Sequence, residues 1–114
     1  MQLNAVEEGR ALVIEVAEKR IDAAVAVRFK DRMRELTDHP AKRVILDLAQ
    51  VEFLDSSGLG AVVGAMKQLG EDRRLDLVGL TPMVDKVFRM TRMDSVFAIF
   101  PDRQTAIWGT ARAS

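Results

Sequence analysis

The sequence has 114 residues, and its 17 basic and 17 acidic side chains give a formal net charge of +0 at pH 7. This length suits a single compact domain over residues 1–114. The balanced charge argues against the basic surface that generic nucleic-acid binding requires. The absence of cysteine excludes disulfides and thiolate metal sites and fits a cytoplasmic location. The sequence also has no apolar run long enough for a membrane span, and its first residues do not form a signal peptide.

The first half of the sequence predicts three strands and one helix. Residues 2–8 alternate weakly in hydrophobicity and residues 11–17 alternate clearly, so we expect the two segments to pair as a hairpin. Apolar residues at steps of three and four then predict an amphipathic helix over residues 23–38, with Asp22 as its N-cap. The β-branched run at residues 43–48 predicts a central strand.

A strand signal gives way to a helix signal at Ser56 and Ser57. Apolar residues recur at helical spacing from there to Leu69, and Gly70 is a suitable C-terminal cap. We therefore expect one of the two serines at the helix N-cap, where the helix dipole favours an anion.

The last third of the sequence repeats the alternation. Residues 74–80 predict a strand, and Thr81 with the proline that follows predicts the start of a third helix. Residues 95–100 are short and apolar and predict a further strand. A last helix is expected after Pro101, and residues 109–114 are expected to form a frayed tail.

The expected order is β-β-α-β-α-β-α-β-α, which indicates an α/β domain. After the opening hairpin, strands and helices alternate, as in a mostly parallel sheet with helices packed on it and one antiparallel edge strand. A small flavodoxin-like domain fits the same order. Periodicity alone does not choose between this fold and others of the same class.

The segment Asp-Ser-Ser-Gly-Leu-Gly at residues 55–60 strongly resembles the phosphorylation segment of bacterial anti-sigma-factor antagonists, whose fold is called the STAS domain. In that family the first serine of the pair accepts phosphate from an anti-sigma factor that is also a kinase. The resemblance implies that Ser56 is the acceptor, with Ser57 as its competitor. It also implies a STAS fold for essentially the whole chain.

The resemblance further implies a partner surface around the acceptor serine. The family has a Gly-Glu-Leu-Asp-like motif after its second strand, and the matching residues here are Lys-Arg-Ile-Asp, which end at Asp22. The aspartate matches, whereas Arg20 reverses the charge of the family's acid. The residues that the resemblance assigns to partner binding are Arg20, Asp22, Asp55, Ser57, Gly58 and Leu59.

Other chemistries fit the sequence poorly. The glycines after Ser57 do not complete a dinucleotide loop, because Val63 stands where its last glycine belongs, and no Walker-type loop is present. The sequence lacks Gly-x-Ser-x-Gly and any pair of histidines, so neither a serine hydrolase nor a metal site is indicated. We therefore expect no catalytic residue, no metal and no cofactor.

The resemblance predicts a non-enzymatic switch. The unphosphorylated protein is expected to bind an anti-sigma factor of the serine-kinase type and free a sigma factor, phosphorylation of Ser56 is expected to release the partner, and a serine phosphatase is expected to reset it. The alternative is a STAS scaffold or transport-complex subunit in which Ser56 is never modified. Nothing in the sequence indicates a homo-oligomer.

Overall fold

The structure is a computed structural model that describes residues 1–113, and the side chains of residues 1–108. Its strands are β1 (Leu3–Glu8), β2 (Ala11–Val16), β3 (Arg20–Ile21), β4 (Arg43–Asp47), β5 (Phe53–Leu54), β6 (Arg74–Val78) and β7 (Ile99–Phe100). Its helices are α1 (Ala26–Leu36), α2 (Ser56–Leu69), α3 (Pro82–Met90), the 3-10 helix η1 (Met93–Ser95) and α4 (Arg103–Ala113). None of the helices in the described part of the chain is long and apolar enough to cross a membrane.

Five strands form one mixed sheet in the order β1-β2-β4-β6-β7. The edge strand β1 runs antiparallel to β2, and the other neighbours in this sheet are parallel. Parallel neighbours need a crossover connection, and α1, α2 and α3 lie within the three crossovers. The predicted mostly parallel sheet with one antiparallel edge strand is therefore confirmed.

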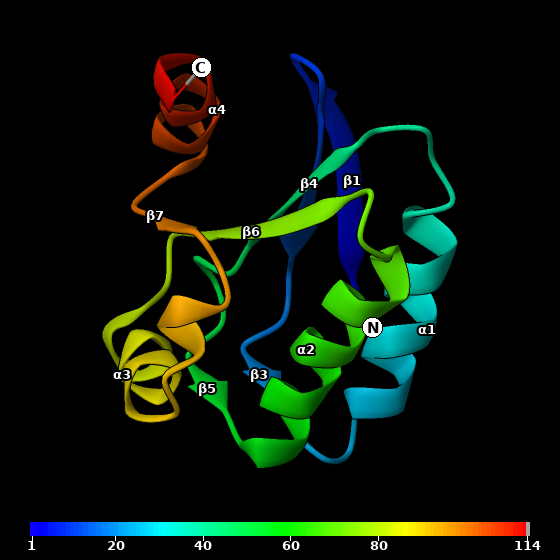
Figure 1. Cartoon of the computed structure of the whole chain (residues 1–114). Coiled ribbons are helices and arrows are strands. Elements are labelled where there is room, and N and C mark those ends of the chain that lie inside the picture. The colour runs from blue at the N-terminus through cyan, green and yellow to red at the C-terminus, as the bar shows by residue number, and fades with distance from the viewer. Residues whose placement is uncertain (114) are drawn as a thin grey trace.

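Helices cover both faces of the sheet, but unequally (Figure 1). In the figure α1, α2 and α3 lie on the lower side of the sheet and α4 lies on its upper side. The lower side holds the main core, in which alternate residues of the central strands meet the buried side chains of the helices. Its buried members include Leu12, Ile14, Val16, Phe29, Met33, Val44, Leu46, Val62, Leu77, Val84 and Phe88.

A smaller apolar cluster lies on the opposite face, where α4 packs. It consists of Ala11, Val13, Ile45, Val78 and Ala106. These strand residues alternate with those of the main core, so the central strands are buried on both faces, as their almost continuous apolar sequences require.

Arg103 fastens the start of α4 to this second face. Its Nε donates to Oδ2 of Asp47 at 2.7 Å and its guanidinium also donates to Glu15 at 3.1 Å. Glu8 lies 3.6 Å from the same guanidinium. The hydrogen bond to Asp47 raises the pKa of Arg103 above its ordinary value. Because Glu8, Glu15 and Asp47 belong to β1, β2 and β4, this one cation joins three strands to α4.

The predicted helix over residues 23–38 is shorter in the structure. It begins at Ala26 and ends at Leu36, and Val25 is its N-cap. Asp22 does not cap it. Oδ1 of Asp22 instead accepts the N–H of Ala24 at 3.1 Å, because a short acidic side chain readily closes a turn with the backbone two residues on.

The predicted strand over residues 95–100 is wrong for most of its length. Only Ile99 and Phe100 pair with β6. Phe97 is buried instead, with its ring edge-on to Phe88 at a centroid distance of 5.7 Å, and its N–H bonds to the carbonyl of Met93. This burial against α3 draws the segment away from β6, so tertiary packing overrides the local strand preference.

The predicted end of α2 and the predicted start of α3 agree closely with the structure. Gly70 follows α2 with a φ of 83°, and Thr81 is the N-cap of α3 with Pro82 in the first turn. The tail expected at residues 109–114 stays a prediction. Helix α4 continues through Ala113, and Ser114 lies outside the described residues.

Candidate functional site

Two segments that are far apart in the sequence meet beside the start of α2. Strand β3 pairs in parallel with β5, so that Arg20 lies opposite Phe53 and Ile21 lies opposite Leu54. Each strand leads directly into a helix region, β3 toward α1 and β5 into α2, and the two helix starts lie at the lower end of the molecule in Figure 1. This short two-stranded sheet therefore places the predicted kinase-docking loop next to the predicted acceptor serine.

Asp55 connects the two segments through both of its carboxylate oxygens. Oδ1 accepts the N–H of Gly58 at 2.8 Å, which makes Asp55 the N-cap of α2. Oδ2 accepts the N–H of Ala23 at 3.2 Å, across 32 residues of sequence. The expectation that Ser56 or Ser57 caps α2 is thus wrong, because the aspartate before them takes that position.

Ser56 and Ser57 occupy the first turn of α2 and are exposed. Within the described residues, neither hydroxyl makes a hydrogen bond to the protein. Asp55 makes no hydrogen bond to the Ser56 hydroxyl, and its two oxygens accept the N–H groups of Ala23 and Gly58 instead. The serines are therefore presented to solvent at the positive end of the helix dipole, free of a structural role.

Gly58 permits the close approach of α2 to β3. It is buried, and a Cβ atom at this position would overlap the carbonyl group of Ile21 and lie 2.9 Å from Cδ1 of Leu54. Leu59, the next residue, is partly buried against the main core. Both residues were predicted to bind a partner, and the structure adds a packing role for each of them.

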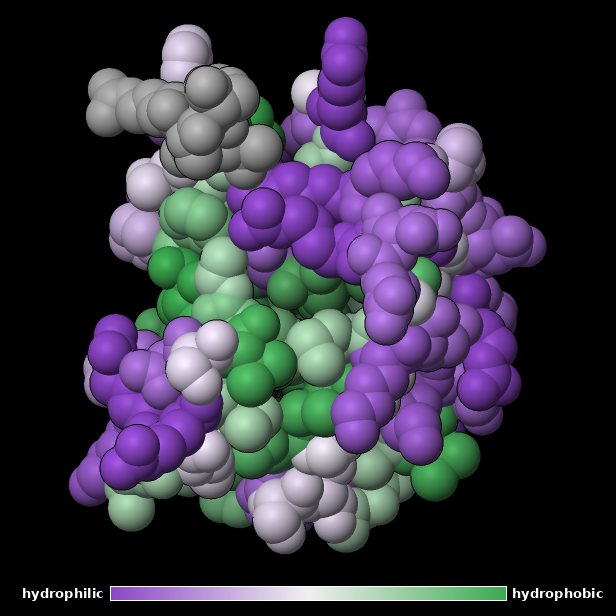
Figure 2. Space-filling model, in the orientation of Figure 1, coloured by the Kyte–Doolittle hydropathy of each residue, from purple (hydrophilic) through white to green (hydrophobic). Residues whose placement is uncertain are grey.

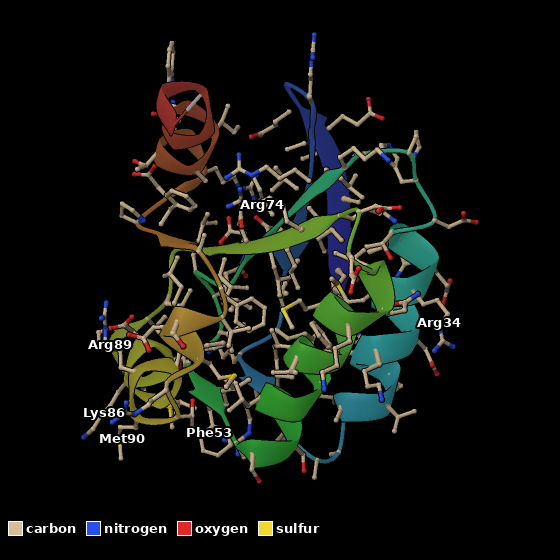
Figure 3. The ribbon with its side chains drawn as sticks, in the orientation of Figure 1. Arg34, Phe53, Arg74, Lys86, Arg89 and Met90 are labelled. Carbon is tan, nitrogen blue, oxygen red and sulfur yellow. The ribbon has the colours of Figure 1, made fainter. Side chains whose placement is uncertain are left out.

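Arg20 and Asp22 lie on the other segment, at the edge of the same region. Nε of Arg20 is 3.3 Å from Oδ2 of Asp22, and the guanidinium stacks over the ring of Phe53 at 4.3 Å from its centroid. Figure 3 shows Phe53 beside the start of α2 at the lower end of the molecule. The Arg20 side chain is 60% exposed, so its charge stays accessible although stacking restricts its position.

The structure therefore brings together all of the residues that the sequence assigned to the site. Sequence reasoning missed the roles of Phe53 as a platform for Arg20 and of the Ala23 N–H as the second partner of Asp55. The apolar pair Phe53 and Leu54 before Asp55 was the one available signal. A two-residue strand is too short for a periodicity argument.

Comparisons with known proteins identify the family of the chain. The family model described as the STAS domain matches residues 2–106. The chain is 31% identical over 80 residues to the anti-sigma-B factor antagonist of Listeria monocytogenes serovar 1/2a, and the match covers 69% of this chain and 70% of the relative.

Solved structures share the fold at lower sequence identity. An anti-sigma factor antagonist from Mycobacterium paratuberculosis superposes with a TM-score of 0.84 at 21% identity, covering 95% of this chain and 92% of the other. The Bacillus cell fate determinant SpoIIAA in its phosphorylated form gives a TM-score of 0.69 at 21% identity and covers 96% and 99% of the two chains. With the family model matched over nearly the whole sequence, the chain belongs to the STAS domain family.

Proposed function

We propose that this protein is an anti-sigma factor antagonist whose binding is controlled by phosphorylation of Ser56. The observation that carries the proposal is that Asp55 and Ser56 have different roles. The aspartate supplies the cap and joins the two loops, which leaves the serine hydroxyl exposed and unbonded within the described residues. A kinase can therefore modify Ser56 without dismantling the fold.

Phosphorylation would change the charge of a small surface strongly. A phosphate adds about −1.5 to −2 charges at neutral pH. It would stand next to the carboxylate of Asp55 and near the Asp22 loop, within a region that the partner must desolvate. Repulsion and desolvation at such an interface oppose binding by a few kcal/mol, so release of the partner follows.

The proposed partner is an anti-sigma factor of the serine-kinase type, and a serine phosphatase would restore the binding form. Relatives support this assignment, since the Listeria protein is named as an anti-sigma-B factor antagonist and SpoIIAA has been solved in a phosphorylated form. The protein then acts by binding, in the cytoplasm, and the kinase supplies the catalytic groups.

The test is phosphopeptide mapping of the full-length protein isolated from its own cells, combined with affinity capture by two variants. We expect phosphate on Ser56 in at least one growth condition. We expect Ser56→Ala to capture an ATP-binding anti-sigma factor, and Ser56→Asp to capture less of it. Unmodified serines in every condition, with equal capture by both variants, would favour a STAS scaffold in which Ser56 is never modified.

A further inference from the structure

The first part of strand β6 has no neighbouring strand on the side away from β4. Strand β4 pairs with all five residues of β6, whereas β7 pairs only with Leu77 and Val78. Successive residues of a strand turn their N–H and C=O groups to opposite sides. The Leu77 N–H bonds to the Ala98 carbonyl on the β7 side, so the backbone groups of Leu75 point to that side as well, where β7 provides no residue opposite them.

A hollow of about 720 Å³ lies beside this open edge. It exists because residues 95–97 turn away from β6 and bury Phe97 against α3. Its apolar lining comes from Met66, Leu75, Val96, Phe97 and Ala98. Figure 2 shows green, hydrophobic surface at the centre of the view, with purple, hydrophilic residues above it and to its right.

Cations outnumber anions at the rim of the hollow. Lys67, Arg73 and Arg74 line it together with Glu71 and Asp76. The Asp76 side chain is only 2% exposed and is held by Arg43 at 2.6 Å and by Arg74 at 2.9 Å. Its charge is therefore already neutralised, while Arg74 is 54% exposed and lies on β6 in Figure 3.

We propose that this β6 groove binds an extended peptide segment of a partner protein by adding a strand to β6. An exposed strand edge pairs with the backbone of an incoming strand, and pockets beside it accept alternate side chains. Here the apolar hollow takes an aliphatic side chain. Carboxylates on the flanking residues of the peptide complement Lys67 and Arg74, which favours an acidic segment.

The groove is separate from the Ser56 region. None of the residues that line it belongs to β3, β5 or the first turn of α2. Peptide binding at β6 therefore does not depend on phosphorylation, and the two proposals can fail independently. A protein with both sites can hold one partner at the switch and a second at the sheet edge.

The test uses the full-length protein, labelled with ¹⁵N, and the probe acetyl-Glu-Val-Leu-Val-Glu-amide. We expect saturable amide shifts at Leu75 and Ala98 and slower hydrogen exchange of the Leu75 N–H. Two further probes carry N-methyl groups on backbone amides. In one probe they lie along one edge of the extended peptide, and in the other probe along the opposite edge. Strand addition uses one edge of the peptide, so we expect one methylated probe to lose binding and the other to retain it.

Single variants then test the charge and the hollow. Val96 is 48% exposed, so Val96→Asp should leave the fold intact and abolish binding. Lys67→Glu should weaken binding several-fold at low salt, with a smaller effect at high salt. Lys86→Glu, an exposed reversal on α3 outside the groove, is the matched control and should bind as the unchanged protein does.

Three outcomes would overturn the proposal. They are the absence of shifts at millimolar probe, equal binding by both methylated probes, and concentration-dependent shifts at Leu75 and Ala98 without any probe. The last outcome would assign the edge to a second copy of the chain.

Discussion

Gly58 lies so close to Ile21 that a Cβ atom on the glycine would stand 2.8 Å from the Ile21 carbonyl carbon. Because the obstacle is backbone, it cannot rotate away as a flexible side chain could. We predict that Gly58→Ala lowers the free energy of unfolding by about 1 to 3 kcal/mol, the usual cost of overpacking a core. Urea denaturation followed by circular dichroism measures it.

Gly60 is the matched control, because it lies in the same helix and a Cβ atom added to it would meet nothing within 4 Å. Alanine is favoured over glycine in a helix by about 1 kcal/mol. We therefore expect Gly60→Ala to keep or raise the stability. Equal losses in both variants would show that the contact with Ile21 does not limit residue 58.

The two hydrogen bonds of Asp55 predict a graded response to substitution. Asp55→Ala removes the cap and the bond to Ala23 and should cost about 1 to 2 kcal/mol of stability. Asp55→Asn keeps a single acceptor oxygen, and its amide nitrogen would face a backbone N–H, so its loss should be smaller but measurable. Chemical denaturation of the three proteins in parallel gives the order. If Asp55→Ala left the stability unchanged, that result would contradict the role of Asp55 in joining the two segments.

Substitutions of the serines should separate modification from folding. Neither hydroxyl caps α2, so Ser56→Ala and Ser57→Ala should each change stability by less than about 0.5 kcal/mol. Under the proposed function, phosphate transfer from the cognate kinase should disappear in Ser56→Ala and persist in Ser57→Ala. Radiolabel incorporation decides between the two residues, and the reverse pattern would move the acceptor to Ser57.

Ser56→Asp should weaken partner binding less than phosphate does, since one carboxylate carries about half the charge of a phosphate group. The fold should tolerate it, because an acid in the first turn of a helix is favoured by about 0.3 to 1 kcal/mol. Calorimetric titration with the cognate anti-sigma factor and thermal melting measure the two effects. A large fall in melting temperature would show that residue 56 has a structural role after all.

Acid should loosen the start of α4. Oδ1 of Asp102 accepts the N–H of Thr105 at 2.7 Å, and this bond holds the pKa of Asp102 below its ordinary value of 3.8. A lowered pKa in the folded state means that the contribution of Asp102 is complete above pH 3.8 and is lost as the pH falls through the folded-state pKa.

Trp108, the single tryptophan, lies on α4 and reports this change by fluorescence. Asp102→Asn keeps a capping oxygen without titrating, so we expect the acid transition of α4 to shrink in this variant. An identical acid titration of both proteins would show that other carboxylates control α4.

The sequence predicted the order of the large elements because their signals are long and local. Residues 11–17 and 43–48 carry continuous strand preference, and Thr81 with Pro82 marks a helix start by residue type alone. Strands β3 and β5 were missed, because two residues each contain no period. Their pairing depends on a contact between distant segments, which local preference does not encode.

Local preference also fails to predict which residue caps α2. Aspartate and serine are about equally good N-caps, so Asp-Ser-Ser offers three starting points for one helix. The Ala23 N–H, supplied by another segment, favours Asp55 by giving its second oxygen a partner. Conversely, Val96 and Phe97 have strand character, but the place for a buried ring beside Phe88 exists only in the folded domain.

The link between Asp55 and Ala23 makes the candidate site a property of the folded domain. It joins residues 32 positions apart, and closing such a loop costs entropy that only the assembled core offsets. A nascent or heat-damaged chain contains the same serine but not the surface that the two loops form together. Under the proposed function, a partner that contacts both loops would therefore bind folded chains and not damaged ones.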